Sequence, residues 1–370
     1  MALQQPPAPR RGERGATYGV PIAVTFREAI EVILGIVLVG LALRDVFDTV
    51  VVPGESRGAL RVARRLLRMT LPIWKWVRKG RPGISPSFAP FVLMASFVVW
   101  MLLLLLGFGL VLMVWGGNWF SPPADTLADA MFIAGSALAT VGLSGIEAHC
   151  PARWVLVASG LCGLAVLTMA VTYLIEVQEG IARRDAGILK ITTTSGGPPS
   201  AIAILERYAA LNAPEEVRRT LRDGRDWCAT VLQTHASHPS LIYFRSVGTG
   251  TGWPGALGAL MDLALIFEML VDDPEARATA VLLREEGLRL IRELSDLIGL
   301  TPKYEGRSVN EVQALCARLR AAGYRLQRSI DTGVFAARRV EHAHCVDAVA
   351  EHLGTARAPL LPELSTSAAV

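Results

Sequence analysis

The sequence predicts an all-α membrane protein with three transmembrane helices, one short re-entrant helix, and an α-helical cytoplasmic domain. The chain of 370 residues is 52% hydrophobic, with a mean hydropathy of +0.39, which is too apolar for an average soluble protein. The apolar residues are also clustered. No Asp, Glu, Lys or Arg occurs from residue 84 to 124, or from Trp154 to Ile175. Each run is long enough to cross ~30 Å of hydrocarbon as a helix.

Composition shifts along the chain predict seven segments. We expect a disordered Pro- and Arg-rich tail (residues 1–19), a first transmembrane helix (20–53), a basic cytoplasmic segment (54–85) and a second membrane domain (86–178). A linker containing TTTSGGPPS (179–200), a helical domain (201–356) and a disordered end (357–370) follow. The five cysteines show no paired spacing, so no disulfide framework is predicted.

The first predicted span is the least regular of the three. Residues 32–43 are entirely apolar, but Glu31, Arg44, Asp45 and Asp48 interrupt the wider stretch. We interpret it as a spanning helix whose charged end emerges among the lipid headgroups. A core helix of a soluble domain is the alternative.

Lys and Arg in the short loops predict the orientation. Residues 54–83 contain many basic residues, whereas residues 116–151 contain none, which places the basic loop in the cytoplasm and the other stretch outside. The N-terminus is then outside, where Arg10, Arg11 and Arg14 conflict with the rule, and the C-terminal region is cytoplasmic. Residues 57–81 mix basic and apolar residues, which suits an interfacial helix on anionic lipid of the plasma (cell inner) membrane; a solvated loop is the alternative.

Between the second and third spans, the sequence SPPADTLADAMFIAGSALA predicts a helix of about 15 residues, too short to cross. Ser121 can cap it, Pro122 suits its first position, and Asp125 and Asp129 suit its positive end. Such a helix must enter the membrane and return. The irregular backbone after it is tolerated at that depth only inside protein or beside water.

The segment TVGLSG, residues 140–145, follows this helix. Backbone carbonyls of Thr140, Val141, Gly142 and Leu143 can replace the water around a cation. Gly142 fits this arrangement because glycine adopts positive φ at little cost.

Residues 129–143, DAMFIAGSALATVGL, resemble the pore helix and signature sequence of potassium channels, whose pattern ends Thr-Val-Gly-Tyr-Gly-Asp. Pro151, Arg153 and the span after them resemble that family's inner pore-lining helix, with Gly160 or Gly163 near its hinge glycine. The resemblance covers roughly residues 86–178. It implies a pore-loop channel domain in a homotetramer that conducts K⁺ passively, without enzymatic activity, cofactor or other metal.

The sequence departs from the family at three positions. Leu143 replaces the aromatic residue, Ser144 the second glycine and Gly145 the closing aspartate, while Glu147 can supply the external charge. A left-handed Ser144 would cost ~1–2 kcal/mol. The segment is also similar to the degenerate filters of Trk-type potassium uptake proteins, so the choice between K⁺ and Na⁺ stays open. The alternatives are a non-conducting membrane scaffold or sensor, and an apolar hairpin with a chance Thr-Val-Gly.

Helical periodicity continues through the cytoplasmic half, with starts expected at Pro214 and at Asp273-Pro274. The predicted helices cover residues 201–211, 214–233, 255–270, 274–298, 308–329 and 333–353. This domain either supports the tetramer or binds a regulatory ligand or protein that acts on residues 176–184. No nucleic-acid partner is indicated.

Three patterns in this half favour ordinary roles over specific sites. GTGWPG, residues 250–255, follows the strand-like SLIYF and matches G-x-G-x-x-G, but no second strand follows, so nucleotide binding is disfavoured. His342, His344 and Cys345 do not share one helical face, which favours surface residues over a metal site. His235 and His238 have no acidic or thiol partner nearby in sequence, so they are interpreted as loop histidines.

Overall fold

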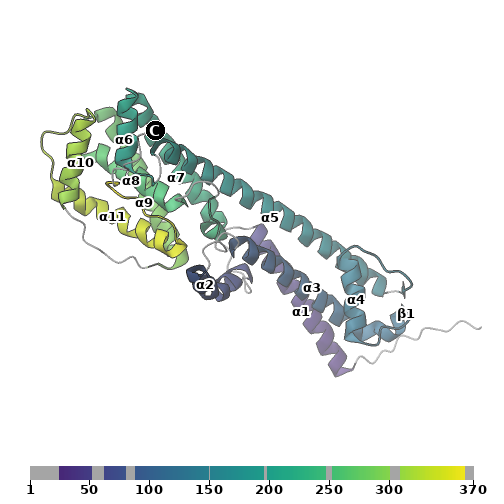
Figure 1. The fold of residues 1–370 in the computed structure, drawn as a ribbon. Helices are drawn as coiled ribbons and strands as arrows, with labels where there is room; N and C mark the ends of the chain where they lie inside the picture. The colour runs from purple at the N-terminus through teal and green to yellow at the C-terminus, as the bar shows by residue number, and fades with distance from the viewer. Residues whose placement is uncertain are drawn as a thin grey trace, which may run out of the picture. The chain divides into compact units, whose positions relative to one another are not determined.

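The computed structural model describes residues 25–51, 62–80, 88–149, 151–195, 198–246, 252–300 and 309–362 (Figure 1). Within these ranges the protein is all-α, with eleven α-helices and one two-stranded sheet. The prediction of an all-α fold is confirmed. The predicted N-terminal tail, residues 1–19, lies outside the described residues.

Two of the helices are long and apolar enough to cross a membrane. They are α3 (Phe88–Trp119), over Phe88–Val114, and α5 (Ala152–Ser195). The first predicted span corresponds to α1 (Phe26–Val50), which does not qualify because charged residues lie near both of its ends. A third span therefore stays a prediction.

The chain forms two compact units. The first unit comprises residues 1–40 and 103–161, and the second comprises residues 41–102 and 162–370. The boundary between them falls within α1, α3 and α5, and not at the loops where the domain boundaries were predicted.

In the first unit, α1 and α3 approach each other at a pair of glycines. A Cβ added at Gly35 would lie 2.6 Å from the Gly107 carbonyl oxygen, and one added at Gly107 would lie 2.9 Å from the Gly35 carbonyl oxygen. Side chains at these positions would separate the two backbones. Small residues allow apolar helices to pack this closely. The unit is completed by β1 (Phe120–Ser121), α4 (Leu127–Leu138), β2 (Glu147–Ala148) and the start of α5.

The second unit is a helical bundle around α8 (Gly252–Met269), which is buried from Trp253 to Phe267. A helix that is apolar all round is expected at the centre of a domain. Around it pack α2 (Val62–Gly80), α6 (Ala201–Ala210), α7 (Pro214–Ser237), η2 (Pro239–Tyr243), α9 (Pro274–Ile298), α10 (Val309–Ala321) and α11 (Thr332–Leu353).

Most helix boundaries in this unit agree with the predictions. Helices start at Pro214 and Pro274 as expected, and the side chain of Asp273 caps α9 by accepting from the Ala276 N–H. The predicted helix 308–329 is wrong at its end, because α10 stops at Ala321 and Gly323 follows with a φ of +90°. The predicted disordered end is wrong over residues 357–362, where Ala358 and Leu360 are buried, and its remainder lies outside the described residues.

Helix α5 is a single helix of 44 residues. The predicted linker at 179–200 is therefore wrong over residues 179–195, which continue this helix. Ile188 and Ile191 belong to the core of the second unit, so packing holds the polar TTTS stretch in the helix. Tertiary contacts override weak local preference here.

Candidate functional site

Helix α4 is the short helix expected between the two apolar spans, but it starts later than predicted. Thr126 caps it, and the Thr126 side chain and Asp129 form a reciprocal capping box. The expectation that Ser121 caps the helix is wrong, because Ser121 lies in β1. The helix is 12 residues long.

The two ends of this segment are tied together. Strands β1 and β2 pair antiparallel, with Phe120 opposite Ala148 and Ser121 opposite Glu147. The His149 N–H donates to the Trp119 carbonyl at 2.8 Å. The chain therefore leaves α3 and returns to α5 at one place, and the exposed Glu147 lies on the returning strand.

Helix α4 lies back along α3. A Cβ added at Gly109 would lie 2.7 Å from Met131 Cγ, and one added at Gly135 would lie 3.2 Å from Leu105 Cδ1. As α4 advances from residue 131 to 135, its contacts on α3 move back from 109 to 105, so the helices run antiparallel. Gly109 precedes the end of α3 by ~15 Å at 1.5 Å per residue.

Helix α4 also contacts α5. Ser159 Oγ donates to the Ala134 carbonyl at 3.3 Å, and a Cβ added at Gly160 would lie 3.3 Å from the Ala137 carbonyl oxygen. Gly160 is therefore a contact point for the end of α4, whereas Gly163 is buried further along the same unbroken helix. Both predicted hinge glycines lie in regular helix in this structure.

The predicted filter begins as the C-terminal cap of α4. The Val141 N–H donates to the Ser136 carbonyl at 3.0 Å, and the Thr140 N–H donates to the Ala137 carbonyl at 3.0 Å. These two bonds form a Schellman motif, whose left-handed position is usually glycine. Thr140 occupies that position with a φ of +54°. For a β-branched residue this conformation is strained.

Positive φ recurs along the segment at glycines. Gly142 has a φ of +85° and Gly145 a φ of +75°, and a Cβ added at either would meet nothing within 4 Å of the chain itself. Backbone conformation, and not space, therefore requires glycine at these positions. The left-handed conformation occurs at Gly145 and not at Ser144. The free-energy cost predicted for a left-handed Ser144 therefore does not arise.

The filter segment is open on one side in the single chain. The Val141 side chain is 78% exposed. Both Val141 and Gly142 donate their N–H groups to Ser136. In the part of the chain that the structure describes, the carbonyl oxygens of residues 140–143 accept no hydrogen bond. These carbonyls remain available to a ligand or to another chain.

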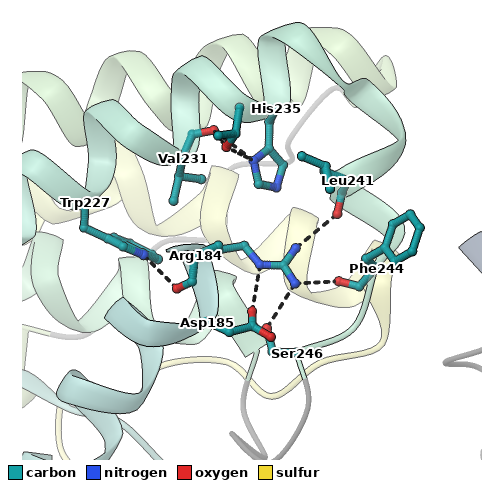
Figure 2. Close-up of polar contacts among 9 residues, drawn as sticks. Arg184, Asp185, Trp227, Val231, His235, Leu241, Phe244 and Ser246 are labelled. Atoms are coloured by element: carbon teal, nitrogen blue, oxygen red, sulfur yellow. Dashed lines mark hydrogen bonds and ion pairs between the residues drawn. The ribbon is translucent and has the colours of Figure 1, made fainter. Parts of the chain in front are cut away.

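A second polar site joins α5 to η2 and the segment after it. The fully buried guanidinium of Arg184 donates to the carbonyls of Leu241 and Phe244 at 3.0 and 2.9 Å, and to Ser246 Oγ at 3.3 Å (Figure 2). It also pairs with Asp185 at 3.0 Å. Burial lowers the pKa of Arg184, and Asp185 acts in the opposite direction.

Glycine brings α5 against α7 next to this arginine. A Cβ added at Gly187 would lie 2.1 Å from Trp227 Cδ1, so any other residue would displace the indole. The Trp227 Nε1–H donates to the Arg184 carbonyl at 2.9 Å (Figure 2). The indole is thus packed and hydrogen-bonded against the same turn of α5.

The histidines at this junction differ from the prediction. His235 is fully buried within α7, and its Nδ1 lies 2.8 Å from the Val231 carbonyl (Figure 2). Burial, with the charge of Arg184 adding to it, lowers the pKa of His235 to about 3. His238 is buried beside α5, with Nε2 3.3 Å from a Glu176 carboxylate oxygen. The interpretation of His235 as a loop histidine is wrong, because it lies within α7. His238 does lie between α7 and η2, but it has an acidic partner, Glu176, that is distant in sequence.

His342 is likewise not a surface residue. It is buried, and its Nε2 lies 3.0 Å from Asp262 Oδ1. Arg339 donates to both carboxylate oxygens of Asp262 at 2.7 and 2.8 Å. Burial opposes the charged form of Asp262, but Arg339 and His342 outweigh it and hold the pKa of this carboxyl below its usual range. Among the described residues, no group of three or more His, Cys, Asp or Glu side chains could hold a metal ion.

The G-x-G-x-x-G pattern does not follow a strand. SLIYF lies mainly in η2, a 3-10 helix, and α8 begins at Gly252, while residues 247–251 lie outside the described residues. A strand before the first glycine is part of the dinucleotide-binding arrangement. The structure therefore gives the pattern no nucleotide-binding context.

No protein-family model, curated protein or solved structure matches the chain. Functional inference therefore rests on the residues and their geometry.

Proposed function

We propose that the protein is one subunit of a tetrameric, potassium-channel-like membrane protein that conducts monovalent cations passively. One observation carries the proposal. Helix α4 folds back between α3 and α5 and delivers Thr140-Val141-Gly142 at its C-terminal end, with the carbonyls of residues 140–143 unbonded. The C-terminal end of a helix carries partial negative charge, which favours a cation at that place.

Exposed apolar stripes support the membrane location. On α5 the large apolar side chains of Val157, Leu161, Leu164, Leu167, Val171 and Ile175 are exposed at helical spacing. Phe91, Met94, Val98 and Leu102 form a similar stripe on α3. Soluble monomers rarely expose large contiguous apolar patches. Lipid tails, or the apolar helices of other subunits, would cover both stripes.

If α3 and α5 cross the bilayer, α4 lies within it, because its contacts on α3, at Gly109 and Leu105, fall inside the apolar span Phe88–Val114. Unbonded carbonyls at that depth are tolerated only beside water or protein. One loop cannot enclose an ion, so four copies related by cyclic symmetry would surround the path with residues 140–143. Glu147 would then lie at the external mouth.

Helix α2 supports the predicted contact with anionic lipid. One side of α2 packs against the core of the second unit through Leu66, Leu67, Leu71 and Trp74. A second apolar stripe is exposed and consists of Met69, Ile73 and Trp76. Arg65 and Arg68 are exposed near that stripe. An apolar stripe with basic neighbours suits the surface of an anionic membrane.

A non-conducting membrane scaffold or sensor is the second candidate. The left-handed Thr140 favours it, because the first filter residue here serves as the C-terminal cap of α4. In that case the cytoplasmic bundle would perform the function.

Flux measurements decide between the two candidates. Purified protein in proteoliposomes should pass K⁺, and the substitution Gly142→Ala should remove at least 90% of the flux because a φ of +85° opposes a side chain. Gly40→Ala is the matched control, because a Cβ at Gly40 meets nothing within 4 Å. Parallel experiments with Na⁺ measure selectivity.

The proposal predicts that the Gly142→Ala variant still assembles as a tetramer. Equal flux through wild-type and Gly142→Ala protein would remove residues 140–143 from the ion path. Absence of cation flux from correctly assembled wild-type protein under all activating conditions would favour the scaffold.

A further inference from the structure

A cavity of about 380 Å³ lies in the second unit, at the N-terminal end of α8. Four aromatic residues contribute to its wall: Trp74 from α2, Tyr243 from η2, Phe244, and Trp253 from α8. Small-molecule sites are typically concave, mostly apolar, and of about 300–1,000 Å³. The cavity is large enough for one small aromatic molecule.

Among the described residues that line this cavity, the one charged side chain is basic. Arg245 lines it and forms no ion pair among the described residues. Ser246 and Thr355 add hydroxyl groups. No Asp or Glu lines the cavity within the described ranges.

The start of α8 adds positive potential at the same place. Gly252 is the first residue of this helix of 18 residues and also lines the cavity. The first N–H groups of a helix lack intrahelical partners and carry the positive end of its dipole. An arginine without an ion pair among the described residues and a helix N-terminus together favour an anionic group.

We propose that this cavity binds a small aromatic molecule with one anionic group, such as a carboxylate. Its ring packs among Trp74, Tyr243, Phe244 and Trp253. Its anionic group meets Arg245 and the N-terminus of α8. All the described residues that line the cavity belong to the second unit.

The cavity shares part of its wall with the Arg184 junction. Phe244 and Ser246 both line the cavity, and both accept hydrogen bonds from Arg184 of α5. A ligand that orders residues 244–246 therefore also stabilises the acceptors that hold α5. Through this shared segment, occupancy of the cavity would stabilise the attachment of α5 to the bundle.

Ligand-observed ¹⁹F NMR tests the proposal on the full chain in lipid nanodiscs. The probe is 4-(trifluoromethyl)benzoate, and 4-(trifluoromethyl)benzamide is the neutral comparison. Empty nanodiscs correct for partition into lipid. The benzoate should bind saturably and about tenfold more tightly than the amide, because only the benzoate forms a charge-assisted hydrogen bond with Arg245.

One variant and one control locate the binding. Arg245→Gln should reduce the preference for benzoate to within about twofold. Arg207→Gln, at an exposed arginine of α6, should leave binding unchanged. Hydrogen exchange at residues 241–246 should slow when benzoate is bound.

Equal affinity for benzoate and benzamide would overturn the proposal, as would an unchanged preference in folded Arg245→Gln protein. Because binding is measured without ion flux, either result leaves the channel proposal untouched.

Discussion

Arg184 Nη1 donates to the carbonyl oxygen of Leu241 at 3.0 Å and ties α5 to η2 across 57 residues of sequence. Nη2 of the same guanidinium reaches the Phe244 carbonyl, so one side chain satisfies two backbone acceptors. Arginine suits this position because its planar fork presents several donors in fixed directions. This contact is one of several that attach α5 to the bundle, together with Trp227 at Gly187 and His238 at Glu176.

Replacement of Arg184 by Gln should destabilise the second unit by about 3 kcal/mol, because buried carbonyls lose charge-assisted bonds. Chemical denaturation of detergent-solubilised protein measures this. Arg183→Gln is the neighbouring control. Arg183 is 58% exposed in its pair with Glu179, so its loss should cost less than about 0.5 kcal/mol. Equal effects of the two substitutions would contradict an anchoring role for Arg184.

Asp262→Asn should be among the most destabilising single changes in the bundle, at about 3–5 kcal/mol. It leaves Arg339 and its positive charge buried without a counter-ion. Denaturation curves should show the loss, whereas Glu293→Gln, in an exposed pair with Arg289, should change little. The double substitution Asp262→Leu with Arg339→Met should recover part of the stability. A single-variant loss below about 1 kcal/mol would show that the pair is dispensable.

The lowered pKa values of Asp262 and His235 both predict a smaller free energy of unfolding in acid, but in different pH ranges. The lowered pKa of Asp262 stabilises the fold above its unfolded value of ~3.9, and this contribution is lost as the pH falls below that value. His235 has a folded pKa of about 3 against an ordinary value of 6.5. Between these two values the unfolded state takes up a proton that the folded state does not, so stability falls as the pH falls.

His235→Phe should therefore flatten the acid limb of the stability curve. Between pH 6 and 4.5 the wild-type protein should lose about 1.4 kcal/mol per pH unit more than the variant. The free energy of unfolding, measured across this range for both proteins, provides the test. Parallel curves would indicate that His235 is protonated in the folded state.

Thr140→Gly should stabilise the first unit by about 0.5–1 kcal/mol, because glycine relieves the strain at a φ of +54°. Thr140→Ala keeps a Cβ and should give no comparable gain. Thermal unfolding in detergent compares the two variants. A gain in stability accompanied by lost K⁺ flux would indicate that the Thr140 side chain serves the filter.

The local elements of this protein could largely be predicted from its sequence. The apolar runs that form α3 and α5, the helix starts at Pro214 and Pro274, and the glycine at a positive φ in residue 142 all follow from spacing, capping and backbone preference. These signals are local, because each depends on a few neighbouring residues.

The errors have a common cause in distant contacts. The sequence around His342 predicts a surface residue, but its partner, Asp262, lies 80 residues away. No acidic partner is near His238 in sequence, but Glu176 of α5 lies beside it. The TTTS stretch predicts a linker, but the helix that contains it packs on the bundle. Hydrogen bonds and burial of this kind leave no local signal.

The sequence by itself determined the all-α class, the apolar helices and the short helix that ends at Thr-Val-Gly, because periodicity and capping are properties of contiguous residues. Only the tertiary structure decided that α4 lies back between α3 and α5, that Thr140 is the left-handed residue of its cap, and that Arg184 holds Leu241 and Phe244. These relationships depend on which distant surfaces pack together, and packing is a property of the folded chain as a whole.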